Sequence, residues 1–181
     1  MTGNTGRTLM VAALSAWAAA TLAAPAPAPA ETAARTASPA FEKLKGLVGE
    51  WVAAEDGEMM KKGDLVARYA LTAAGTALVE TVFPGSAHEM VTVYHADGGD
   101  LVLTHYCMEG NQPRMRARNA APPRFDFQFD GGTSLDPRHD RHMHQATLEL
   151  LGADEIRSQW TEVAEAAPVL VVQSHLVRKS R

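Results

Sequence analysis

The sequence predicts an all-β protein: an antiparallel up-and-down β-barrel of about ten strands with one short N-terminal helix. From residue 64 onward, apolar and polar residues alternate, so that every second side chain of a strand lies on the same face. Turn sequences rich in Gly, Pro and Asp separate these stretches at short intervals. This spacing is typical of barrels and sandwiches, and it does not fit folds in which helices connect parallel strands.

The helix is expected at the start of the domain, in the stretch SPAFEKLKGLVGEW. Ser38 stands at a capping position, Pro39 fits the first turn, and apolar residues follow at helical spacing. We expect the helix to end at Gly46 or Gly49.

Strands are expected around Trp51 and then in nine segments: 64–72, 76–84, 88–96, 100–108, 114–120, 124–130, 143–151, 155–163 and 169–178. The Asp-Gly-Gly turn at 97–99 is a strong hairpin signal. In RFDFQFD, Phe125, Phe127 and Phe129 share one face, which we expect to be buried. The opposite orientation, with polar groups inside the barrel, is less favoured because buried charges are costly unless they are paired.

Residues 1–30 have the features of a signal peptide. Arg7 precedes an apolar, alanine-rich run that is too short to anchor stably in a bilayer, and small residues follow it. Cleavage is expected after Ala30, with a cut near Ala23 or Ala24 and an uncleaved inner-membrane anchor as alternatives. Residues 31–38 are expected to form a disordered leader, and residues 39–181 the barrel domain. The protein is therefore expected to be exported, to the periplasm or out of the cell, without stable membrane insertion.

Charge and cysteine content narrow the class of partner. After removal of residues 1–30, 16 basic and 21 acidic residues remain, which gives a net charge of −5. The sequence has no basic stripe that could neutralise phosphates, so no nucleic-acid partner is expected. Cys107 is the only cysteine, which excludes an intrachain disulfide. The oligomeric state is left open.

Two short motifs at the ends of the expected barrel carry a family resemblance. Gly49-x-Trp51 near the start, with Arg178 near the end of the last strand, resembles the calycin pattern of lipocalins and fatty-acid-binding proteins. The resemblance implies that the tryptophan closes one end of the barrel and that the arginine packs across its ring, where cation–π attraction stabilises the pair. Residues 41–178 also resemble an uncharacterised group of bacterial exported lipocalin-like proteins, through EMVTVYH, LTHYC, GNQPRM and a closing strand that ends in Arg.

More distantly, the chain resembles nitrobindin-like haem proteins, which share the barrel. Their proximal histidine lies on the last strand at even spacing before an arginine. Here His175 is three residues before Arg178, so the two are expected to face in opposite directions. The resemblance therefore does not carry a haem site to this chain, and no cofactor is expected.

The histidines raise the possibility of a metal site or a haem or metal carrier. His142 and His144 are two residues apart on an expected strand and could chelate a transition metal from one face. The favoured alternative is that DPRHDRHMH, residues 136–144, forms a solvated loop with hydrogen-bonded histidines.

A second possibility is an enzyme that uses His105, Tyr106, Cys107 and Glu109 for acid–base chemistry on a small molecule. A nucleophilic cysteine needs a base within hydrogen-bonding distance and a lowered pKa. Side chains two residues apart on a strand seldom approach so closely, and Tyr106 should face the other way. We therefore favour Cys107 as a small, half-buried apolar residue, and we assign no catalytic residues.

Arg114, Arg116 and Arg118 alternate along one face of the strand after the turn. Facing outward, they would form a solvated stripe that discourages edge pairing; facing inward, they would bind an anionic head group. The outward orientation is favoured.

The favoured function is binding of a small, mainly apolar or amphipathic molecule inside the barrel, because a barrel of about ten strands is too wide to be filled by its own side chains. The candidate ligand-binding residues are Glu80, His105, Tyr106, Asn111, Gln112 and Arg116.

Overall fold

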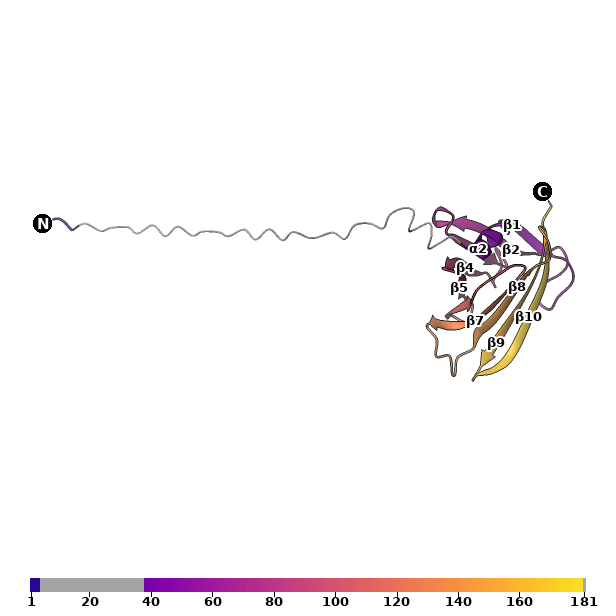
Figure 1. The fold of residues 1–181 in the computed structure, drawn as a ribbon. Coiled ribbons are helices and arrows are strands. Elements are labelled where there is room, and N and C mark those ends of the chain that lie inside the picture. The colour runs from indigo at the N-terminus through magenta and orange to yellow at the C-terminus, as the bar shows by residue number, and fades with distance from the viewer. Residues whose placement is uncertain (4–37, 181) are drawn as a thin grey trace.

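A computed structural model describes residues 1–3 and 38–180, and these residues confirm the predicted fold class. Ten antiparallel strands form a closed barrel after one short helix (Figure 1). The strands are β1 (Gly49–Ala53), β2 (Leu65–Thr72), β3 (Ala77–Val82), β4 (Met90–Asp97), β5 (Asp100–Tyr106), β6 (Gln112–Ala117), β7 (Arg124–Thr133), β8 (His142–Leu150), β9 (Glu155–Ala164) and β10 (Ala167–Arg178). The expected signal peptide and leader lie almost entirely outside the described residues.

The helix α2 (Pro39–Lys45) forms where the capping pattern predicts it. The side chain of Ser38 accepts a hydrogen bond from the backbone N–H of Phe41, and Pro39 occupies the first turn. The helix ends at Gly46. Its inner face buries Phe41 and Leu44 in the same core as Trp51 of β1, so that α2 closes one end of the barrel.

The strand order is up-and-down, with each strand hydrogen-bonded to its neighbour in the sequence. The ring is completed where β1 pairs with β10, with Trp51 opposite Arg178. The strands of this pair differ in length, because β1 has 5 residues and β10 has 12. The segment between β1 and β2, residues 54–64, lies at the end of the barrel opposite α2.

Large apolar side chains fill the α2 end of the barrel. Phe125 and Phe127 are fully buried, as the alternation in β7 predicts, whereas Phe129 on the same face is only partly buried. Leu101, Leu103 and Met115 pack in the same core. Toward the other end the packing becomes incomplete, and that is where the interior cavity described below is found.

The strand boundaries differ from the expected ones around the turn after β5. Strand β6 begins at Gln112 and includes Pro113, and β7 extends to Thr133. The register between these strands shifts between Pro113 and Met115. The extra residue lies on β7, where Asp130 and Gly131 stand opposite Arg114, and β6 continues through Pro113, a position expected to be in the turn.

Candidate functional site

The barrel interior contains a cavity of about 150 Å³ at the end opposite α2. Most of its wall is apolar, formed by inward-facing side chains that include Met60, Val66, Val82, Phe83, Met90, Met143, Ile156, Leu170, Val172 and Leu176. Its polar lining is restricted to a few groups, among them Glu80, His105, Ser158, Glu162 and Ser174. Met59 and Met108 also line it and are exposed, so the cavity reaches solvent on this side.

One wall of the cavity region carries a row of polar side chains across four neighbouring strands. Tyr69 is opposite Glu80, Glu80 is opposite Thr92, and Thr92 is opposite His105 in the register of β2 to β5. All four face inward and are at most 8% exposed. The antiparallel pairing thus places a tyrosine, a carboxylate, a hydroxyl and an imidazole side by side.

Glu80 is the centre of this row. Its two carboxylate oxygens accept hydrogen bonds from the hydroxyls of Tyr69 and Tyr94, each at 2.7 Å. Burial raises the pKa of Glu80, and the hydrogen bonds from Tyr69 and Tyr94 oppose that rise. Burial also raises the pKa values of Tyr69 and Tyr94 well above the ordinary value, so both remain donors. The carboxylate is therefore fully engaged by the protein.

His105 ends the row and faces the cavity. Its Nδ1 lies 2.9 Å from the hydroxyl oxygen of Thr92, and its ring centroid lies 5.0 Å from that of Trp160 across the barrel. The side chain is 3% exposed, and burial lowers its pKa from 6.5 to about 4, so the imidazole is neutral at neutral pH. Its Nε2 is buried and has no hydrogen-bond partner within residues 38–180.

The two ring nitrogens of His105 differ in their partners. Nδ1 is hydrogen-bonded to the hydroxyl of Thr92, which can donate or accept, so both neutral tautomers fit this pair. Nε2 offers a lone pair in one tautomer and an N–H in the other.

The open end of the cavity carries a second buried carboxylate. Glu162 is 3% exposed and is paired with Arg141, whose side chain is 53% exposed. Nearby, the hydroxyls of Ser158 and Ser174 are hydrogen-bonded to each other at 2.7 Å. Cys107 is half-buried in the lining, and burial raises the pKa of its thiol. A thiol with a raised pKa is a poor nucleophile.

The structure places the expected ligand-binding residues in different surroundings. Glu80 and His105 line the cavity, whereas Tyr106 is 51% exposed on the outer face of β5. Asn111 is buried beside the loop between β7 and β8. Its Nδ2 donates to the carbonyl of Arg141 at 2.7 Å, and its Oδ1 has no partner among the described residues. Gln112 accepts from Thr133 on the barrel surface.

Arg116 also lies on the outer face, with the neighbouring Arg114. Its guanidinium forms salt bridges with Asp97, Asp100 and Asp130, and these hydrogen bonds raise its pKa. Neither Arg114 nor Arg116 lines the interior cavity. An anionic head group inside the barrel would therefore not meet this arginine stripe.

His142 and His144 come together at the start of β8, where the strand is bulged between Met143 and Gln145. The expectation of a solvated loop over residues 136–144 is therefore wrong at its end, where His142 is fully buried. Nδ1 of His142 donates to the carbonyl of Asp140 at 2.8 Å, so its Nε2 accepts from Nδ1 of His144 at 3.0 Å. Burial, and then the neighbouring His142, lower the pKa of His144. Within residues 38–180, no three His, Cys, Asp or Glu side chains are arranged to hold a metal ion.

At the α2 end, Arg178 and Trp51 form the closure of the barrel. The guanidinium lies 4.5 Å from the centroid of the indole ring and donates to the carbonyls of Val48, Gly46 and Ala153. The indole N–H donates to the carbonyl of Leu47 at 2.7 Å. His175 faces outward, within 2.7 Å of Glu155, as its odd spacing from Arg178 predicts.

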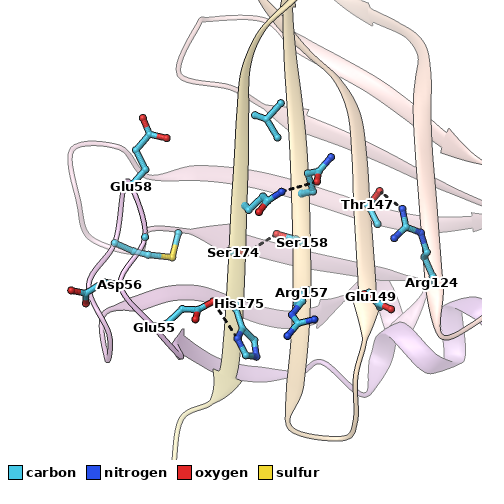
Figure 2. Close-up of a pocket in the computed structure, with 15 residues that line it drawn as sticks. Glu55, Asp56, Glu58, Arg124, Thr147, Glu149, Arg157, Ser158, Ser174 and His175 are labelled. Carbon is cyan, nitrogen blue, oxygen red and sulfur yellow. Dashed lines mark hydrogen bonds and ion pairs between the residues drawn. The ribbon is translucent and has the colours of Figure 1, made fainter.

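A second hollow, of about 600 Å³, lies along the outer side of β8, β9 and β10 next to the segment after β1 (Figure 2). Charged residues of both signs line it, including Glu55, Glu149, Arg124 and Arg157. Figure 2 shows that its polar groups already contact one another: Arg124 with Thr147, Ser158 with Ser174, and His175 with Glu55. It therefore has less capacity to select a ligand than the interior cavity.

Several residues of the site were not expected from the sequence: Tyr69, Thr92, Tyr94, Trp160 and Glu162. The hairpin turns could have identified two of them, Tyr69 and Thr92, because a turn fixes which residues of its two strands stand opposite each other. If Asp97 pairs with Asp100, counting back along both strands places Thr92 opposite His105. The same counting from the pair Thr72 and Ala77 places Tyr69 opposite Glu80.

Comparisons with known proteins add no assignment. No protein-family model matches the chain, and a search of curated proteins found no match. Among the described residues, no helix has the length and apolar character needed to cross a membrane.

Proposed function

We propose that this chain is an exported, lipocalin-like protein that binds a small, mainly apolar molecule in the interior cavity of its barrel. The closed ten-stranded barrel is compatible with ligand binding. The lipocalin-like assignment is supported by the Trp51–Arg178 closure, and export is supported by the signal-peptide features of residues 1–30.

The observation that carries the binding proposal is the unpartnered Nε2 of His105. A buried polar atom without a hydrogen bond costs free energy, on the order of 1–3 kcal/mol, and native proteins satisfy nearly all such atoms. The side chain that carries this atom lines a cavity whose other walls are mostly apolar. A ligand that fills the cavity and pairs with Nε2 would remove that cost.

Binding is favoured over catalysis by the protonation chemistry of the same residues. An imidazole with a pKa of about 4 is a weak base at neutral pH, and the thiol of Cys107 is held in its neutral form by burial. Neither group is activated. The neutral His105 is suited to orienting a ligand by a hydrogen bond.

Native mass spectrometry of the full-length chain, expressed in an exporting cell and purified from the periplasmic fraction, tests both parts of the proposal. We expect a protein mass that corresponds to residues 31–181, together with a retained small molecule. A protein that keeps residues 1–30 would contradict export with cleavage, and an empty barrel under gentle conditions would contradict ligand retention.

Two neighbouring valines of β10 provide a matched pair of variants. Val172 faces the cavity, and Val171 is 46% exposed on the outer face. We expect Val172→Phe to fill the cavity and abolish ligand retention, because the added ring occupies the binding volume. Val171→Phe adds the same ring outside and should retain the ligand, and equal retention by both variants would place the binding site elsewhere.

A further inference from the structure

The interior cavity also restricts the chemical class of ligand, and this inference rests on the binding function proposed above. The first restriction is size. Ligand pockets for drug-sized molecules measure roughly 300–1,000 Å³, whereas this cavity measures about 150 Å³. Apolar protein cavities of about 150 Å³ bind molecules of the size of benzene. A long acyl chain or a porphyrin exceeds this volume, and a single ring fits it.

The second restriction is a hydrogen-bonding group. Nδ1 of His105 is bonded to Thr92, whereas Nε2 has no partner among the described residues. The group that satisfies Nε2 must therefore be polar, and a hydroxyl can either donate to a lone pair or accept from an N–H. A ligand without a polar group would leave this atom unpaired.

The third restriction is charge. The cavity lining contains two buried carboxylates, Glu80 and Glu162. Arg141 is the cationic side chain of this lining, and it is paired with Glu162. An anionic ligand would meet two carboxylates with no spare cation in the described lining, which is unfavourable in a buried site. Both carboxylate oxygens of Glu80 already accept hydrogen bonds from tyrosine hydroxyls, so Glu80 has little left to offer a cationic ligand.

The fourth restriction is shape. The indole of Trp160 lies against the imidazole of His105, with ring centroids 5.0 Å apart, and both rings line the cavity. Met60, Met90 and Met143 contribute flexible side chains to the rest of the wall. Aromatic rings pack favourably against an indole face and against thioether sulfur.

Taken together, the geometry points to a neutral, single-ring ligand of the phenol type, whose hydroxyl forms a hydrogen bond with Nε2 of His105 and whose ring packs against Trp160. Phenol, toluene and benzoate have the same ring and differ only in the group that would meet His105. Comparing phenol with toluene tests the hydrogen bond, and comparing phenol with benzoate tests the charge. Isothermal titration calorimetry of the full-length chain with each of the three measures the preference.

We expect phenol to bind roughly tenfold more tightly than toluene, since a net hydrogen bond of about 1 kcal/mol corresponds to nearly that ratio. Benzoate should not bind measurably.

His105→Leu should reduce the phenol-to-toluene affinity ratio to about one while toluene still binds. Thr92→Val removes the hydrogen-bond partner of Nδ1, which orients the imidazole, and should reduce the ratio by a smaller factor. Tyr106→Leu, on the outer face of the same strand, is the control and should keep the ratio.

Equal affinities for phenol and toluene in the unmodified chain, or an unchanged ratio in a folded His105→Leu variant, would overturn the ligand class. Tightest binding by benzoate would overturn the neutral charge. In each of these cases the binding function stands if Val172→Phe abolishes the measured binding. If none of the three probes binds, the single-ring class is wrong, and the retained ligand in the native mass spectrum decides the proposed function separately.

Discussion

His105 is neutral at neutral pH because its imidazole is buried, and this has a consequence for stability. The folded chain binds fewer protons than the unfolded chain between pH 6.5, the ordinary pKa, and about 4, the pKa in the barrel. The free energy of unfolding therefore decreases as the pH falls through this window. The raised pKa of Glu80 acts in the opposite direction, because the folded chain then binds more protons than the unfolded chain.

We expect His105→Leu to weaken the pH dependence of stability. The contribution of His105 to the difference in unfolding free energy between pH 7 and pH 5 is about 2 kcal/mol, and the variant should lose it. Urea unfolding at both pH values measures this difference. His139→Leu, which replaces an exposed histidine, should behave as the unmodified chain does. The same pH dependence in His105→Leu and the unmodified chain would contradict the assigned burial effect.

At the scale of the elements, alternation and turn residues were sufficient to predict the strands. The hairpins between β2 and β5 have regular register, so that even the cross-strand pairs of the polar row follow from their turns. The bulges were not predictable in this way. Register shifts occur between Pro113 and Met115 and between Met143 and Gln145, where one residue changes the pairing of the strand that follows. Strand alternation did place His142 and His144 on one face, and their rings are in contact, but the register shift beside them was not derivable from it.

The contact between Arg178 and Trp51 joins the last strand to the first. Arg178→Ala removes the cation–π contact and the donors to three backbone carbonyls, so we expect a loss of roughly 2–4 kcal/mol in unfolding free energy. Arg178→Lys should recover only part of it, because an ammonium cannot reach all of these acceptors as a planar guanidinium does.

Urea unfolding checks this prediction, with Arg157→Ala as the matched control on the neighbouring strand β9. Arg157 is exposed on the outer face, and its removal should change the unfolding free energy by less than about 0.5 kcal/mol. Equal effects of the two alanine variants would show that the closure contributes no special stability.

At the scale of the whole molecule, the sequence predicts the barrel but not the contents of its interior. Adjacent strands are related by turns, whereas His105 and Trp160 face each other across the barrel from strands β5 and β9. Which residues meet across the interior depends on strand tilt and on the stagger of the closed sheet, and no local pattern encodes these. The alternation along β5 shows that His105 and Tyr106 face opposite sides, but not which of them faces inward. The closed barrel places His105 inside and Tyr106 outside.

The pairing of β1 with β10 also has a topological consequence. The ten strands form a closed ring, and each strand except the pair β1 and β10 is joined to its neighbours by a loop. Since β1 and β10 are already hydrogen-bonded to each other, the chain could begin at another loop without changing any strand pairing. A circular permutant that links Arg178 to Ser38 through a short Gly-Ser linker, and that begins at the exposed turn Glu165–Ala166, should keep the barrel and unfold in a single transition. Far-ultraviolet circular dichroism during urea unfolding measures this, and a permutant without β-structure would show that the native chain order is required.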